Sequence, residues 1–165
     1  MKRLAFLSVL LVSFAQAEEI VIRTGLGIRV PGARRSAVHV DPIEHKIVIG
    51  SWKSPTEGQE GWTKVSANEK GEFSGGPTGG GYVYSTLESA SERIVFLEAS
   101  GHSLVYVNGV PRTGDPYSYG YVSLPIELKK GKNEFLFLCG RGRLSAKLVD
   151  APQAISMDLR DTTLP

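Results

Sequence analysis

Short apolar runs separated by turn-forming residues recur along the chain between residues 18 and 150. The runs are rich in Val, Ile, Tyr and Phe. Gly, Pro, Asn or Asp interrupts them at intervals of roughly 8 to 12 residues, a spacing typical of β-strands. Helical periodicity is weak, so at most one helical turn is expected, in residues 86–92. The expected strands are residues 20–23, 37–40, 46–49, 62–67, 82–85, 93–99, 103–107, 119–124, 134–139 and 143–149.

The expected strands differ in how many of their faces are apolar. In the last one, Leu144, Ala146 and Leu148 alternate with Arg, Ser and Lys, so one face is packed and the other faces water. Residues 93–99 and 135–139 carry apolar side chains on both faces, which is typical of strands that lie centrally in a layered structure.

Turn signals indicate how the strands connect. Asn108-Gly109 lies between two apolar runs and predicts a type I′ hairpin, because both central positions of that turn need positive φ. Gly140-Arg141-Gly142 is expected to close a second hairpin. The irregular stretches at residues 50–61 and 74–81 indicate crossovers. The sequence therefore predicts an all-β fold, with two antiparallel sheets packed as a sandwich of the jelly-roll type rather than an up-and-down barrel.

The two ends of the chain differ in composition from its middle. Met1-Lys2-Arg3, an apolar stretch and Ala15-Gln16-Ala17 form the three-part pattern of a signal peptide over residues 1–17. A membrane anchor is the alternative, but the apolar stretch is too short to span a bilayer. Residues 151–165 lack β alternation and are interpreted as a linker or tail, so residues 18–150 form the expected domain. We expect a secreted or periplasmic protein with no membrane span after cleavage.

The charge balance bears on possible partners. Removing residues 1–17 removes two of the 19 basic residues and none of the 17 acidic ones, so the expected mature chain is close to neutral. A neutral chain has no electrostatic footprint for nucleic acid or for an anionic membrane. Short basic clusters such as Arg141-Gly142-Arg143 lie beside turn residues and are interpreted as solvated loops.

Cys139 is the one cysteine of the chain, so it forms no internal disulfide. It lies in an apolar run, and a buried small hydrophobe is favoured over a free thiol for a partner or metal. No second cysteine or nearby histidine completes a metal set, and no metal or other cofactor is expected. A structural Ca²⁺ involving Asp115 and loop carbonyls is a minor alternative.

No complete catalytic motif is present. The nucleophile elbow G-x-S-x-G, the H-E-x-x-H motif and the P-loop are all absent, so no enzymatic activity is expected. His102 beside Ser103 is interpreted as a turn histidine, because adjacent side chains point apart. Glu98, inside an apolar strand, is interpreted as a carboxylate bonded to an Arg or a backbone amide rather than as a functional acid. Gly25-Leu26-Gly27 and the glycine-rich residues 75–81 are interpreted as flexible connections rather than phosphate cradles.

Polar-edged aromatic residues are the most suggestive binding feature. Tyr117, Tyr119 and Tyr121, spaced by two, would share one face of an extended segment. Such rings stack on sugars or anchor a partner surface, although bracing of a loop is the alternative. The candidate ligand-binding residues are Arg112, Asp115, Tyr117, Tyr119, Tyr121 and Trp62.

Residues 62–149 also resemble a known type of domain. They are similar to the galactose-binding-like β-sandwich module that precedes the catalytic domain in secreted α/β-hydrolase or peptidase proteins of planctomycete-like bacteria. Leu128, Gly131 and Asn133 form an L-x-x-G-x-N pattern that is widespread in such sandwich modules. The other segments that carry the resemblance are Gly81-Tyr82-Val83-Tyr84, Leu97-Glu98-Ala99-Ser100-Gly101-His102, Val105-Tyr106-Val107-Asn108-Gly109 and Gly114-Asp115-Pro116-Tyr117-Ser118-Tyr119-Gly120-Tyr121.

The resemblance implies a secreted accessory module without catalytic activity. Its expected partners are carbohydrate or a hydrolase catalytic domain. In the family a hydrolase domain follows the linker, whereas this sequence stops at Pro165. One alternative is therefore the N-terminal part of a secreted hydrolase or peptidase whose catalytic domain is missing from this chain. A structural cell-surface module is the other.

Overall fold

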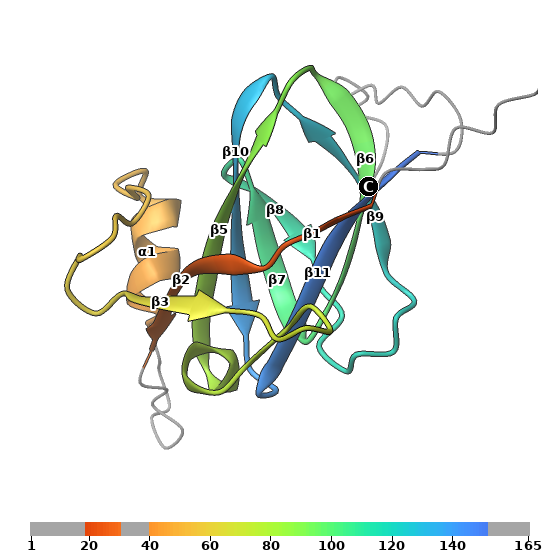
Figure 1. The fold of residues 1–165 in the computed structure, drawn as a ribbon. Coiled ribbons are helices and arrows are strands. Elements are labelled where there is room, and N and C mark those ends of the chain that lie inside the picture. The colour runs from red at the N-terminus through yellow and green to blue at the C-terminus, as the bar shows by residue number, and fades with distance from the viewer. Residues whose placement is uncertain (1–18, 31–39, 152–165) are drawn as a thin grey trace, which may run out of the picture.

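The computed structural model describes residues 19–30 and 40–151, which fold into two antiparallel β-sheets and one short α-helix (Figure 1). One sheet has five strands and the other six. The five-stranded sheet has the order β1 (Glu19–Val21), β11 (Arg143–Asp150), β6 (Arg93–Ser100) and β9 (Ser123–Leu128), and β4 (Glu72–Ser74) also pairs with β11. The six-stranded sheet has the order β3 (Thr63–Ser66), β2 (Thr24–Arg29), β5 (Gly81–Ser89), β10 (Gly131–Cys139), β7 (His102–Val107) and β8 (Val110–Thr113).

The main core lies between the two sheets and confirms the predicted all-β sandwich. Its largest side chains include Phe135 and Phe137 of β10 and Phe73 of β4, none of which is more than 1% exposed. β10 lies between β5 and β7, as the apolar character of both its faces predicted. In β11, Leu144, Ala146 and Leu148 are buried while their neighbours are half-buried or exposed, which confirms the predicted alternation.

A second apolar cluster covers the other face of the six-stranded sheet. Successive side chains of a strand point to opposite faces, so Val83 enters the main core while Tyr82 and Tyr84 enter this second cluster. Helix α1 (Pro42–Val48) lies over it, at the left of Figure 1, and contributes Ile43. The remaining buried members are Trp62, Tyr106 and Leu136.

The helix replaces a predicted strand at residues 46–49, and that prediction was wrong. The Asp41 carboxylate accepts hydrogen bonds from the backbone N–H groups of Ile43 (2.8 Å) and Glu44 (3.0 Å), which is an N-cap, and Pro42 occupies the first turn. This start signal outweighs the β propensity of the Ile-Val-Ile run that follows. Of the expected strand at residues 37–40, only Val40 is described, and it is irregular.

Two further findings concern strands of the six-stranded sheet. Residues 86–92, where at most one helical turn was expected, contain none, because Thr86 to Ser89 belong to β5 and pair with β10. Gly25 and Gly27 lie in β2, not in a flexible connection. A Cβ atom at Gly25 would lie 2.4 Å from the Tyr84 carbonyl oxygen, so glycine here permits close approach of two strands.

The two predicted hairpins have different outcomes. Asn108 (φ 50°) and Gly109 (φ 83°) form the turn between β7 and β8, which confirms the first. The Gly140-Arg141-Gly142 turn does not close a hairpin, because β10 pairs with β5 and β7 while β11 pairs with β1, β4 and β6. The turn instead passes the chain from one sheet to the other, as sandwich connections commonly do.

The L-x-x-G-x-N pattern has a structural explanation in the turn between β9 and β10. Gly131 has φ 92°, and the Asn133 side chain is fully buried. Asn133 Oδ1 accepts from the Lys129 N–H (2.8 Å), and its Nδ2 donates to the carbonyl oxygens of Lys129 (2.8 Å) and Gly131 (3.0 Å). Leu128, also fully buried, anchors the turn in the core. The pattern therefore fixes a turn of the fold.

The remaining connections were only partly foreseen. Residues 50–61 link α1 to β3, and the 3₁₀ helix η1 (Gly76–Gly79) lies between β4 and β5. The strand expected at residues 119–124 begins only at Ser123. The expected signal peptide at residues 1–17 and almost all of the expected tail, from residue 152, lie outside the described residues.

Candidate functional site

Three tyrosines form an exposed stack in the connection between β8 and β9. Tyr117, Tyr119 and Tyr121, here called the tyrosine segment (residues 117–121), are 61%, 65% and 87% exposed. Successive ring centroids are 5.6 Å and 5.8 Å apart, with interplanar angles of 23° and 28°. The segment is not extended, since Ser118 (φ 58°) and Gly120 (φ 71°) are left-handed. The predicted extended backbone was therefore wrong, although the three rings do lie together.

Asp115 holds the tyrosine segment in this shape. Its side chain is buried and accepts hydrogen bonds from the backbone N–H groups of Tyr119 (3.1 Å) and Gly120 (2.7 Å). Desolvation opposes ionisation of the carboxyl, but these N–H donors outweigh it and hold the pKa of Asp115 below its usual value. The segment is a backbone nest whose anion is supplied by the chain itself.

A polar hollow of about 430 Å³, here called the arginine hollow, adjoins the tyrosine segment. The Arg141 guanidinium lies over the Tyr117 ring, 4.7 Å from its centroid, which is a cation–π contact. At one side the hydroxyls of Ser100 and Ser145 are hydrogen-bonded at 2.9 Å. The residues that line the hollow are Glu72, Ser100, Pro116, Tyr117, Ser118, Arg141, Arg143 and Ser145.

A second hollow of about 450 Å³ continues across the outer face of the five-stranded sheet. It shares Ser100 and Ser145 with the arginine hollow, so the two are neighbours. Lys147 lies in it between two carboxylates, 3.0 Å from Glu19 and 3.3 Å from Glu98. Glu98, expected to bond an Arg or a backbone amide, is thus paired with a lysine.

The structure brings together only some of the predicted site residues. Asp115 and the three tyrosines form one unit. Trp62 is only 8% exposed and packs beneath α1 in the cluster on the six-stranded sheet, with its ring centroid 6.3 Å from that of Trp52. Arg112 lies on the edge strand β8, opposite Val105. Neither residue lines the arginine hollow.

Several lining residues that the sequence interpretation missed come from β11 and the turn before it, and Glu72 of β4 and Ser100 of β6 were missed as well. Arg141 and Arg143 had been interpreted as part of a solvated loop. Ser145 belongs to the polar face of the predicted alternating strand, which was noticed as solvent-facing but not as a binding surface. The alternation in β11 indicated a polar, solvent-facing surface. It did not indicate that the tyrosine segment lies beside that surface.

His102 is a buried histidine of β7, not a turn histidine. Its side chain is 1% exposed, neither ring nitrogen has a hydrogen-bond partner among the described residues, and the ring packs edge-on against Phe137 at 5.4 Å. Burial lowers the pKa of His102 from 6.5 to about 4, although the Asp115 carboxylate opposes this shift. No hydrogen bond joins His102 to a described serine or cysteine.

Cys139 is buried in the main core, as predicted. It is 2% exposed, and burial raises the pKa of its thiol to about 12. A thiol in that environment stays protonated at neutral pH and is a poor nucleophile and metal ligand.

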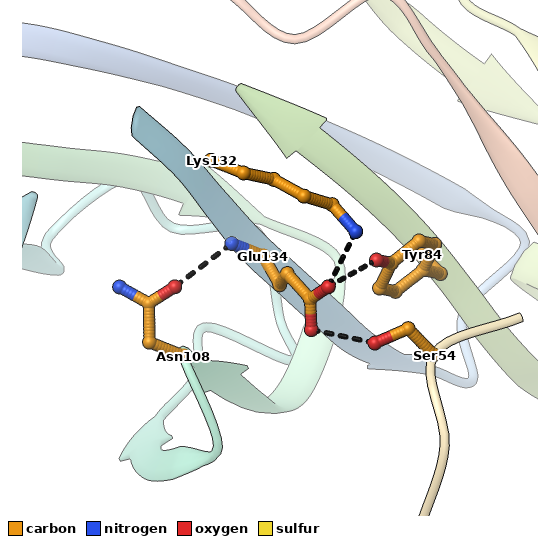
Figure 2. Close-up of polar contacts among 5 residues, drawn as sticks. All are labelled: Ser54, Tyr84, Asn108, Lys132 and Glu134. Carbon is orange, nitrogen blue, oxygen red and sulfur yellow. Dashed lines mark hydrogen bonds and ion pairs between the residues drawn. The ribbon is translucent and has the colours of Figure 1, made fainter. Parts of the chain in front are cut away.

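Figure 2 shows a second polar cluster, centred on Glu134 of β10, which the sequence analysis did not anticipate. The Glu134 carboxylate accepts from Ser54 Oγ (2.7 Å) and Tyr84 Oη (2.8 Å), and Lys132 Nζ lies 2.7 Å away. Burial opposes ionisation of Glu134, but these contacts hold its pKa below its usual value. The hydrogen bond from Ser54 joins the loop of residues 50–61 to β10 of the six-stranded sheet. We therefore assign the cluster a structural role.

Two properties of residues 19–30 and 40–151 concern metal ions and membranes. No group of three or more His, Cys, Asp or Glu side chains is placed to hold a metal ion. The Asp115 carboxylate is engaged by N–H donors, and the calcium alternative stays a prediction. No described helix has the length and apolar character needed to cross a membrane.

Comparisons with known proteins returned no family model, curated protein or solved structure that matches the chain. The resemblance to hydrolase-associated modules therefore remains a hypothesis drawn from the sequence segments quoted above.

Proposed function

We propose that this protein is a secreted, non-catalytic β-sandwich module that binds glycan at the outer face of its five-stranded sheet, which no described helix covers. The observation that carries the proposal is the exposed tyrosine stack beside the arginine hollow. Aromatic rings supply apolar surface to sugar rings, and hydroxyl and guanidinium groups bond their hydroxyls. The segment is also pre-shaped by Asp115, which lowers the entropy lost on binding.

The choice between the available hollows rests on how their charged groups are already used. A larger hollow of about 530 Å³ lies at the six-stranded sheet and includes Tyr84, Lys132 and Lys64. Its lysines are paired at 2.7 Å, Lys132 with Glu134 and Lys64 with Glu57. In contrast, Arg141 has no carboxylate partner in the part of the chain that the structure describes. The arginine hollow therefore offers the less satisfied polar groups to a ligand.

The proposal is tested by binding of the purified protein to an array of plant, algal and bacterial polysaccharides. Tyr119→Ala removes the central ring of the stack, and we expect it to weaken binding by about thirtyfold or more, as for other aromatic anchors. Val110→Ala, at an exposed apolar residue of the β7–β8 hairpin, is the matched control and should bind normally. Both variants should keep the far-ultraviolet circular dichroism of the parent.

Two outcomes of the binding test would overturn the proposal. A folded protein that binds no polysaccharide would overturn the proposal, as would binding that survives Tyr119→Ala. Docking on a catalytic domain, the other role considered for such a module, would then be the better account, because Tyr and Arg are also enriched in protein interfaces.

A further inference from the structure

We infer that the arginine hollow takes an anionic sugar unit, one that carries a carboxylate or a sulfate. This inference rests on the proposed glycan binding and specifies the ligand's chemistry. It is carried by the charges that line the hollow, by the position of the Arg141 guanidinium and by the contrast with the neighbouring hollow.

Positive charge exceeds negative charge in the arginine hollow. Arg141 and Arg143 line it, and Glu72 is the one carboxylate among its lining residues. The Arg143 Nη1 to Glu72 Oε2 distance is 3.9 Å, the longest of the ion pairs among the described residues, and the Arg143 side chain is 73% exposed. An exposed pair at that separation contributes little. Both guanidinium groups therefore remain able to bond an incoming anion.

The Arg141 guanidinium has a partner in the chain itself. Its Cζ atom lies 4.7 Å from the Tyr117 ring centroid, and this cation–π contact favours a position of the side chain beside the tyrosine stack. A guanidinium bonds carboxylate and sulfate oxygens through two parallel N–H groups, and such charge-assisted bonds are stronger than neutral ones. The tyrosine stack begins at Tyr117, the ring that Arg141 contacts. A sugar whose acid group binds Arg141 can therefore lie along the rings.

The neighbouring hollow has no such excess. Among its lining residues Lys70 and Lys147 balance Glu19 and Glu98. The positive region is thus confined to the end of the surface that adjoins the tyrosines. The formal net charge of the whole chain is only +2, so the protein has little general attraction for polyanions. The preference expected here is local, for an acidic unit within a glycan.

The test compares glycans that differ only in charge. Polygalacturonate is paired with its fully methyl-esterified form, and dextran sulfate with dextran, so that the carboxylate and sulfate arms are separate. Single-stranded DNA serves as a polyanion without sugar-acid groups. The proteins are the parent, Arg141→Gln, Arg143→Gln, Tyr121→Ala and the control Lys130→Gln, which removes one exposed charge at the β9–β10 turn.

We expect at least one charged glycan to bind about tenfold or more tightly than its neutral partner, the effect of one charge-assisted contact. Each arginine variant should lose most of that preference, while Lys130→Gln stays within about twofold of the parent. Binding should weaken as salt increases, and less steeply in the arginine variants.

Each contrary outcome has a distinct meaning. Equal binding to charged and neutral forms, lost in Tyr121→Ala but kept in the arginine variants, would overturn the anionic preference while glycan binding stands. DNA binding as tight as polygalacturonate binding would overturn it too, since the site would then recognise charge alone. No binding to any of the glycans would overturn both the preference and the proposed function.

Discussion

The outer faces of the two sheets differ, although both sheets obey the same alternation of side chains. The outer face of the six-stranded sheet carries Tyr82, Tyr106 and Leu136, and α1 with the loop of residues 50–61 covers it. The outer face of the five-stranded sheet carries Ser145 and other polar residues, and hollows open onto it. A covered apolar face contributes stability, whereas a polar face that no described helix covers, beside exposed aromatic rings, is where we propose that binding occurs.

The largest effect that would sharpen this comparison comes from truncating a ring on the covered face. Trp62→Ala should lower the free energy of unfolding by about 3–5 kcal/mol, because the indole is 8% exposed and its loss leaves a cavity under α1. Tyr119→Ala, an aromatic truncation on the open side, should change it by no more than about 0.5 kcal/mol. Urea denaturation of both variants gives the two values. Equal losses would mean that the two sides do not differ as described.

The next largest expected effect is a pH dependence of stability that comes from the buried His102 of β7. Its folded-state pKa of about 4 lies below its ordinary 6.5, so the unfolded chain takes up the proton first as the pH falls. The stability that the neutral, buried His102 contributes is complete above about pH 6.5 and is lost as the pH drops toward 4. Between pH 7.5 and 4.5 we expect a loss of about 2–3 kcal/mol.

The control for this pH effect is His102→Leu, which removes the titrating group but keeps an apolar side chain. The variant should show a much flatter stability profile between pH 7.5 and 4.5, measured by denaturant titration. Glu134 and Asp115 have lowered pKa values, so their contributions to stability are present at neutral pH and are lost mainly at pH values below this window. An unchanged slope in His102→Leu would show that another group is responsible.

The smallest expected effect concerns the hydrogen bond that joins the loop of residues 50–61 to the six-stranded sheet. Ser54→Ala removes the 2.7 Å hydrogen bond to the Glu134 carboxylate and should cost about 1–2 kcal/mol. Ser51→Ala is the matched control in the same loop, since Ser51 is exposed and its hydroxyl contact with the Lys46 carbonyl oxygen is 3.4 Å long. Hydrogen exchange at Trp52 and Trp62 should rise in Ser54→Ala alone. If the two variants showed the same stability and the same hydrogen exchange, Glu134 would not hold the loop on the sheet as described.

The sequence predicted the sandwich because its strongest signals are local. The alternation in β11 and the Asn108-Gly109 turn depend on neighbouring residues and were read correctly. The errors have two causes. Gly25 and Gly27 were interpreted as a flexible connection because the strands that pair with them, β3 and β5, are distant in the sequence. The run at residues 46–49 was interpreted as a strand because its β propensity was given more weight than the local helix start at Asp41 and Pro42.

The candidate site was predictable in part for the same reason. The period-two spacing of Tyr117, Tyr119 and Tyr121 predicted that their rings share one face of an extended segment. The rings do lie together, but on a segment that contains the left-handed residues Ser118 and Gly120. Trp62 has the same chemical character, and only the packing of α1 shows that it is buried. Arg141 joins the tyrosines through a contact between segments more than twenty residues apart, which no local pattern contains.

The most direct test of the account is to map where a glycan contacts the protein. Trigalacturonate is titrated into ¹⁵N-labelled protein and the backbone amide shifts are followed by NMR. The account predicts that the largest shift changes fall in the tyrosine segment, at residues 141–145 and at Ser100. Changes centred on α1 or on the hollow beside Tyr84 and Lys132 would contradict it. The absence of changes with both millimolar trigalacturonate and a sulfated dextran oligosaccharide, titrated in the same way, would also contradict it.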